Sequence, residues 1–104
     1  MNQFDIVANP FPRSRERQPF LVALQSDVLN RNFNTVVVAP LEPAASGTFA
    51  DRLNPRVEID GSAFVLITQE IVTVRKSVLG KPRGSIALER DKIIGALDML
   101  FTGF

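Results

Sequence analysis

Acidic side chains are the residues of this chain best suited to acid–base chemistry, because the sequence contains neither histidine nor cysteine. Two carboxylates can work as general acid and general base when they lie close together. The candidates are scattered along the chain, at Asp27, Glu58, Asp60, Glu70, Glu89, Asp91 and Asp98. No two of them have a spacing that indicates such a pair, so the residues alone predict no catalytic site.

Nucleophilic and metal-dependent chemistry also lack the residues they need. Without cysteine or histidine the chain can form no disulfide, no thiolate nucleophile and no Cys/His zinc site. Ser26-Asp27 has no histidine with which to form a hydrolase triad. Gly80 and Gly84 follow no phosphate-loop pattern, and the carboxylates lack the clustering of a magnesium or calcium site. We therefore expect no metal ion and no cofactor.

Three arginines alternate within the segment 9–19, at Arg13, Arg15 and Arg17. Three prolines in the same segment deny it the hydrogen bonds of a strand, so it is predicted to be a loop. In an extended loop the three side chains would point the same way. Two interpretations stay open: a solvated loop that keeps the protein soluble, or a docking patch whose guanidinium groups bind the carboxylates of a partner.

The chain ends in an apolar stretch, residues 99–104, which holds two of the eight phenylalanines. Phe101 lies seven residues after Ile94, a spacing that predicts packing of a helix against the rest of the fold. Phe104 follows Gly103, which is expected to end that helix. Phe104 is therefore a candidate for a surface that contacts another protein.

Length and charge restrict the remaining possibilities. With 104 residues we expect one domain, covering 1–104. Twelve basic against eleven acidic residues give a net charge of +1, which argues against a domain whose affinity depends on neutralising phosphates. No signal peptide and no apolar run long enough to cross a bilayer is present, so we expect a cytoplasmic protein without a membrane partner.

The candidate residues are positioned by a predicted set of short strands followed by one helix. The predicted strands are 4–7, 20–25, 35–39, 56–59, 63–67 and 71–74. The β-branched run 35–39 is typical of a strand buried on both faces, and Asp60-Gly61 predicts a tight hairpin turn. The segment 41–53 is expected to be a loop with a short strand or one helical turn.

From Leu88 onward the apolar residues recur at steps of three and four, which predicts a C-terminal amphipathic helix. They are Ile93, Ile94, Leu97, Leu100, Phe101 and Phe104. Gly95 is unfavourable inside a helix, and we interpret it as a site of close packing. The whole pattern predicts a mainly β (α+β) fold, antiparallel, with one helix at the end.

Five blocks of the sequence, in the same order, resemble the CcdB toxins. They are 20–29, 36–41, 59–64, 77–80 and 94–104. The resemblance covers essentially the whole chain, and the length suits the family. It implies an SH3-like, partly closed antiparallel barrel of the CcdB/MazF type with a small extra sheet and a C-terminal α-helix. It also implies a homodimer in which the two C-terminal helices meet near the two-fold axis.

The resemblance implies a mode of action and partners as well. CcdB toxins act stoichiometrically, not as enzymes: they bind the A subunit of DNA gyrase, a topoisomerase II, and trap it with cleaved DNA. A partly disordered CcdA antitoxin wraps the toxin and removes it from gyrase. With the toxin it represses their operon, so DNA is contacted only through the antitoxin complex. Such pairs are linked to plasmid maintenance.

Carried onto this chain, the family's gyrase-contacting positions fall on seven residues. They are Val28, Leu29, Asp98, Phe101, Thr102, Gly103 and Phe104. Family members usually end in Trp-Gly-Ile, with the tryptophan stacked on a gyrase arginine, whereas the tail here is Thr-Gly-Phe. An asparagine is common where Asp98 stands, and Asp98 could pair with the same arginine. Arg13, Arg15 and Arg17 are the candidates for contact with the antitoxin.

Two alternatives stay open. Because the related MazF and Kid endoribonucleases share the barrel, the chain could cleave RNA. Without histidine, that reaction would depend on an arginine and a carboxylate, for example Arg75 near Glu70. The chain could also be a relative that keeps the fold and the antitoxin but has a diverged or lost target.

Overall fold

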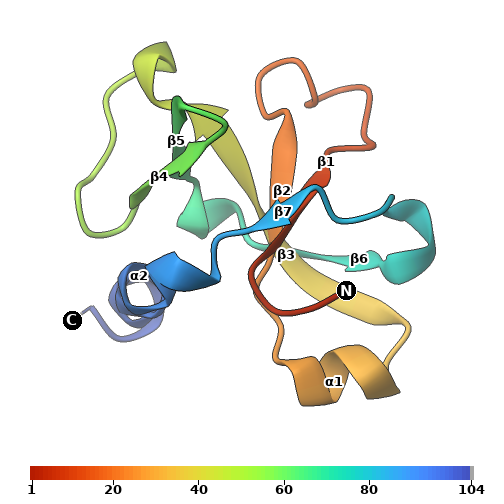
Figure 1. The fold of residues 1–104 in the computed structure, drawn as a ribbon. Helices are drawn as coiled ribbons and strands as arrows, with labels where there is room; N and C mark the ends of the chain where they lie inside the picture. The colour runs from red at the N-terminus through yellow and green to blue at the C-terminus, as the bar shows by residue number, and fades with distance from the viewer. Residues whose placement is uncertain (104) are drawn as a thin grey trace.

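A computed structural model of the chain describes residues 1–103, which form seven strands, two α-helices and four short 3-10 helices (Figure 1). The strands are β1 (Asp5–Ala8), β2 (Phe20–Ala23), β3 (Thr35–Pro43), β4 (Arg56–Ile59), β5 (Ser62–Leu66), β6 (Val72–Arg75) and β7 (Gly84–Ser85). The helices are α1 (Asp27–Asn32), η1 (Ala44–Ser46), η2 (Thr68–Glu70), η3 (Lys76–Val78), η4 (Ala87–Glu89) and α2 (Arg90–Thr102).

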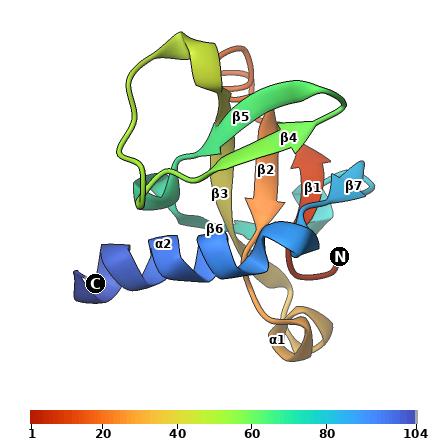
Figure 2. The ribbon, with the colours of Figure 1, turned by 60° about the vertical axis from the view of Figure 1, so that its left-hand side comes forward.

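All seven strands belong to one antiparallel sheet in the order β4-β5-β3-β2-β1-β7, with β6 also paired to β3. The central strand β3 is nine residues long and pairs with three strands, β2, β5 and β6. Val38 pairs with β2 and with β6, and Leu41 pairs with β2 and with β5. β5 and β6 therefore follow one another along the edge of β3 opposite β2. The sheet curls into a half-barrel with α2 at its side, as predicted (Figures 1 and 2).

Both faces of the central strands are buried. Alternate residues of β1 to β3, such as Ile6, Val22 and Leu41, contribute to a larger cluster that α2 completes through Ile93. The residues between them form a second, smaller cluster: Val7, Leu21, Ala23, Val36 and Val38. Val74 and Leu79 cover this cluster. The prediction that 35–39 is buried on both faces is confirmed at Val36, Val38 and Ala39, whereas Val37 is half-buried and Thr35 is exposed.

The predicted end of this strand at Ala39 is wrong, because β3 continues through Pro40 to Pro43. The carbonyl oxygen of Pro40 accepts the N–H of Ile67 at 2.9 Å, so the backbone of Pro40 faces the β5–β6 edge. Its register position lies between the last residue paired with β6 and the first paired with β5. The proline nitrogen therefore faces a gap in the ladder, where no donor is needed.

Several turns agree with the sequence. Asp60 and Gly61 have φ of 51° and 82°, as the tight turn between β4 and β5 requires. η1 is the helical turn expected within 41–53. Gly103 ends α2 in the left-handed conformation, with φ of 80° and its N–H donating to the Met99 oxygen at 3.1 Å. The helix begins at Arg90, two residues after Leu88, which lies fully exposed in η4.

Candidate functional site

The C-terminal end of α2 presents Phe101 to the solvent. Ile93 and Ala96 are fully buried against the sheet, but Phe101 is 69% exposed. The prediction that Phe101 packs the helix against the sheet is therefore wrong. Two causes combine: Phe101 lies about 80° around the helix axis from Ile93, and the last turns of α2 extend past the strands (Figure 2). The Phe101 ring is therefore accessible to another molecule.

The other described residues of the tail surround Phe101 without burying it. Asp98, Thr102 and Gly103 are all exposed. The Thr102 hydroxyl donates to the backbone oxygen of Asp98 at 2.7 Å. No cationic group among residues 1–103 lies within 4.0 Å of the Asp98 carboxylate. Phe104 was also predicted to belong to this surface, and it lies outside the described residues.

The helix α1, to which the sequence assigned no element, displays the second part of the predicted surface. Val28 is 58% exposed and Leu29 is 43% exposed. Phe33, which directly follows the helix and was not predicted as a site residue, is 54% exposed. α1 and the residue that follows it therefore present three apolar side chains to the solvent.

Polar contacts, not an apolar face, hold α1 in place. Asn30, the buried residue of the helix, exchanges hydrogen bonds with Gln25: its Nδ2 donates to the Gln25 backbone oxygen at 3.0 Å, and its Oδ1 accepts from Gln25 Nε2 at 3.1 Å. Lys76 Nζ donates to the Asn30 backbone oxygen. Asp27 Oδ1 accepts the Gln3 N–H at 2.7 Å. Hydrophobic periodicity could not reveal this helix, because its buried residue is an asparagine.

The two parts of this surface are not adjacent within one subunit. Figure 1 shows α1 and the C-terminal end of α2 on different sides of the molecule. The structure thus exposes every described residue of the predicted target surface, but a single chain does not bring Val28 and Leu29 next to Phe101.

The arginine loop is a hydrogen-bonded turn and not an extended segment. Two N–H groups, those of Ser14 and Arg15, donate to the Phe11 oxygen, at 3.2 and 3.0 Å. Asn9, which is buried, closes the turn: its Nδ2 donates to Ser14 Oγ at 3.0 Å and to the Gln18 oxygen at 2.8 Å. The extended conformation in which alternate arginines would point the same way is therefore absent from this loop.

The arginines differ in their partners. Arg13, Arg15 and Arg17 are all exposed, but only Arg17 has a carboxylate partner in the described part of the chain: its Nε lies 3.8 Å from Glu42 Oε2. Arg13 and Arg15 are thus available to an acidic partner, and Arg17 is partly engaged within the chain.

A buried glutamine joins the arginine loop to two carboxylates. Gln18 is 4% exposed, and its Nε2 donates to Glu42 Oε2 at 2.7 Å and to Glu70 Oε1 at 3.0 Å. The sequence did not single out Glu42. Arg75, suggested as a partner for Glu70, lies at the far end of β6, so the structure does not bring the two together.

Metal binding and membrane insertion find no support in the residues described. Among them, no three His, Cys, Asp or Glu side chains are grouped closely enough to hold a metal ion. Neither α-helix formed by residues 1–103 has the length and apolar character that crossing a bilayer requires.

The family model described as CcdB protein matches residues 3–103, which is nearly the whole chain. No curated protein sequence matches the chain.

Solved structures of bacterial toxins share the fold. A mycobacterial endoribonuclease in complex with its cognate antitoxin superimposes with a TM-score of 0.71 at 15% identity, covering 96% of this chain and 93% of the other. The Mycobacterium tuberculosis toxin MazF-mt6 gives a TM-score of 0.70 at 15% identity, covering 96% of both chains. A further structure, described as an Mtb toxin, gives 0.67 at 19% identity, covering 81% of this chain and 92% of the other. At such identities the likeness establishes the fold.

Proposed function

The chain belongs to the CcdB family, and on this basis we propose that it is the toxin of a toxin–antitoxin pair, which binds the A subunit of DNA gyrase and traps the gyrase complex with cleaved DNA. The observation that carries the proposal is the 69% exposure of Phe101 at the free end of α2. Packing among residues 1–103 leaves most of this side chain uncovered. An anchor of this kind supplies much of the energy of a protein interface when a partner buries it.

Dimerisation would build the complete target surface. Within one subunit, Phe101 and the α1 pair Val28 and Leu29 lie apart (Figure 1). A two-fold axis near the C-terminal ends of α2 would place two copies of Phe101 side by side, and each contact of the tail would occur twice. We therefore propose a homodimer whose paired helix ends engage the target, with the two copies of α1 as outer contacts.

The tail chemistry suggests how a target arginine is held without tryptophan. Phe101 offers an exposed aromatic face, and the open carboxylate of Asp98 precedes it by three residues, almost one helical turn. A guanidinium group could stack on the ring and pair with the carboxylate. Thr102 and Gly103 are proposed to contact the target beside them, as is Phe104, which lies outside the described residues.

A CcdA-like antitoxin is the second proposed partner. Arg13 and Arg15 are exposed and have no carboxylate partner among residues 1–103, so an acidic segment could pair with both. Binding of DNA would then occur only through the toxin–antitoxin complex.

Expression in a sensitive host with and without the antitoxin tests the proposal. The wild-type chain should arrest growth, and DNA cleaved by gyrase should accumulate. Phe101→Ala should reduce both effects. Leu88→Ala is a matched control, since Leu88 is a fully exposed apolar residue at the opposite end of the helical region. Growth arrest without cleaved DNA, or without binding of purified protein to the gyrase A dimerisation region, would contradict gyrase as the target.

RNA cleavage is the alternative function, and one contact favours it. Gln18 brings the carboxylates of Glu42 and Glu70 to a single amide nitrogen, beside Arg17. One carboxylate could take the proton of a ribose 2′-hydroxyl as that oxygen attacks phosphorus, while Arg17 stabilises the added negative charge. The bond from phosphorus to the 5′-oxygen would then break, leaving a 2′,3′-cyclic phosphate, and the departing 5′-oxygen would take a proton from water. Incubation of purified protein with single-stranded RNA tests this: cleavage that Glu42→Gln abolishes would favour the nuclease. Normal growth with intact antitoxin binding would instead indicate a lost target.

A further inference from the structure

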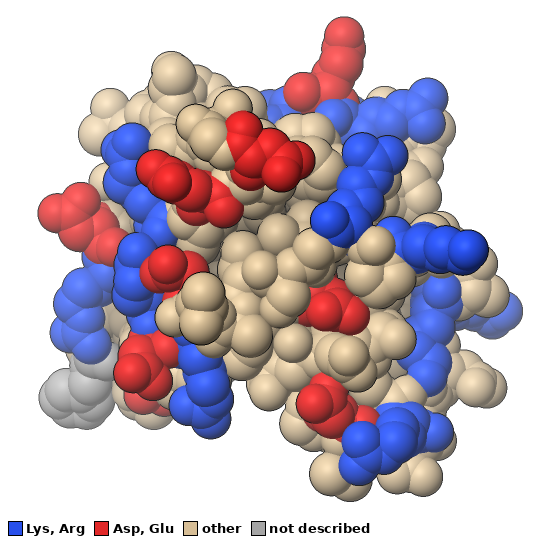
Figure 3. All heavy atoms as spheres, viewed as in Figure 1, with Lys and Arg blue, Asp and Glu red and all other residues tan. Residues whose placement is uncertain are grey.

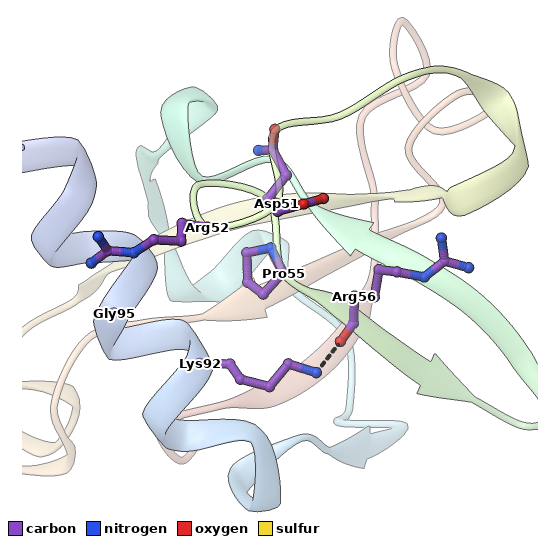
Figure 4. Close-up of a pocket in the computed structure, with 7 residues that line it drawn as sticks. Asp51, Arg52, Pro55, Arg56, Lys92 and Gly95 are labelled. Atoms are coloured by element: carbon purple, nitrogen blue, oxygen red, sulfur yellow. Dashed lines mark hydrogen bonds between the residues drawn. The ribbon is translucent and has the colours of Figure 1, made fainter. Parts of the chain in front are cut away.

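A hollow separates the middle of α2 from the segment 51–56 that leads into β4. Its volume is about 380 Å³, and Pro55 lies between its two basic walls, with Arg52 on one side and Lys92 on the other (Figure 4). Lys92 extends across the hollow: its Nζ donates to the Arg56 oxygen at 2.8 Å and lies 3.0 Å from Glu89 Oε2. Neither the target surface nor the arginine loop includes these residues.

The segment on one side of the hollow is held rigidly by a buried asparagine. Asn54 is 4% exposed, and its Nδ2 donates to the Leu66 oxygen at 3.0 Å and to Gln69 Oε1 at 2.8 Å. Its Oδ1 accepts the Ala50 N–H at 3.2 Å. The hollow is therefore preformed, and a ligand entering it would not have to order this wall.

Gly95 opens into the hollow without a role in the packing of the chain. A methyl group in place of its hydrogen would meet no atom within 4 Å, so the expectation that Gly95 permits close packing within the chain is wrong. Apart from proline, glycine is the least favourable residue in a helix interior. A glycine that the chain's own packing does not require, facing a hollow, leaves room for the backbone of another molecule to approach.

The charge around the hollow is locally basic. Arg52, Arg56 and Lys92 line it with the Asp51 carboxylate, which lies beyond Pro55 from Lys92 (Figure 4), while a second carboxylate, that of Glu89, lies 3.0 Å from Lys92 Nζ. No carboxylate oxygen among residues 1–103 lies within 4.0 Å of Arg52 or Arg56. Figure 3 shows acidic and basic groups alternating along this side of the molecule, so the surface offers no broad field for a polyanion. Arg52 and Lys92, on either side of Pro55, can instead pair with individual carboxylates of a peptide.

We propose that this hollow binds an acidic segment of a protein partner, in which carboxylates flank one aliphatic side chain. The aliphatic side chain lies over Pro55 and Gly95, and the carboxylates pair with Arg52 and Lys92. The partner is the antitoxin, an identification that rests on the proposed function. The chemistry of the hollow does not depend on that identification.

Titration of the isotope-labelled protein with a short synthetic peptide of alternating glutamate and leucine tests the proposal. The Gly95 amide should shift and saturate in NMR spectra, and labelled peptide should give the affinity. The double variant Arg52→Glu/Lys92→Glu should weaken binding by about tenfold or more. Lys81→Glu/Arg83→Glu, which changes the net charge equally at two exposed cations outside the hollow and the arginine loop, should retain most of the affinity.

Gly95→Ala supplies a second, opposite signature. It should raise the melting temperature, because alanine favours the helix and the methyl group meets nothing, yet it should weaken peptide binding. A stabilised variant with unchanged affinity would overturn the role of Gly95. Equal losses of peptide affinity in the two double variants would show that the peptide is held by the net charge of the protein and not by the hollow. Tighter binding of an RNA oligonucleotide, with shifts of the same amides, would show that the hollow binds phosphate. Because the titration requires no toxicity, its failure leaves the gyrase proposal standing, and a non-toxic chain can still bind the peptide.

Discussion

Two alanine substitutions on α2 should separate stability from target binding. Phe101→Ala should weaken binding and leave the fold intact, whereas Ile93→Ala should destabilise the fold. Ile93 is fully buried, and truncation of such a side chain costs about 2–5 kcal/mol of unfolding free energy. Phe101 is 69% exposed, so about a third of its area is covered. One third of the transfer free energy of a buried phenylalanine is about 0.5–1 kcal/mol.

Urea denaturation followed by circular dichroism measures both values, with equal slopes expected if only stability changes. The series should be run at two protein concentrations, because a dimer that buries Phe101 would make the apparent stability depend on concentration. Binding to the gyrase A fragment should fall by about 2 kcal/mol or more in Phe101→Ala, as for other aromatic anchors. A loss of stability equal to that of Ile93→Ala at the lower concentration would place Phe101 in the core and refute the assignment. Unchanged gyrase affinity would remove it from the target surface.

Substitution of two buried polar residues tests which hydrogen bonds hold the segment 51–56 and the arginine loop in place. Asn54→Ala leaves the buried Leu66 oxygen without its donor and should lower the unfolding free energy by at least about 2 kcal/mol, measured in urea; an unchanged midpoint would contradict the rigid wall. Gln18→Ala removes the donor shared by Glu42 and Glu70 and should speed amide hydrogen exchange in the arginine loop more than in β3. Uniform exchange across both segments would contradict that role.

Local signals in the sequence predicted those elements whose backbone conformation is determined by a few neighbouring residues. Asp60-Gly61 supplied the left-handed positions of a hairpin turn, and Gly103 supplied the left-handed end of a helix. The β-branched run 35–39 predicted the central strand. Pro40 led to the wrong prediction that the strand ends at Ala39. Its missing backbone N–H would interrupt the strand only if a neighbouring strand needed that hydrogen bond, and this depends on where β5 and β6 end.

The candidate site was harder to predict because exposure is a property of the assembled fold. Periodicity identified the apolar stripe of α2, but it could not show that the sheet ends before Phe101. α1 escaped detection since its buried residue, Asn30, is polar, while its apolar residues face the solvent. The contact of Gln18 with Glu42 and Glu70 joins residues up to 52 positions apart, a separation that no local pattern reports.

The positions of Phe101 and Gly95 on one helix bear on how an antitoxin could release a toxin from its target. They lie six positions apart, which corresponds to about 9 Å along the axis and about 120° around it. A segment seated over Gly95 would therefore approach α2 from a different side than a target that covers Phe101. An antitoxin docked first in the hollow would gain a high local concentration near the tail before displacing the target. Release would then begin from a complex of all three partners, and substitutions at Arg52 and Lys92 would slow it without altering target affinity.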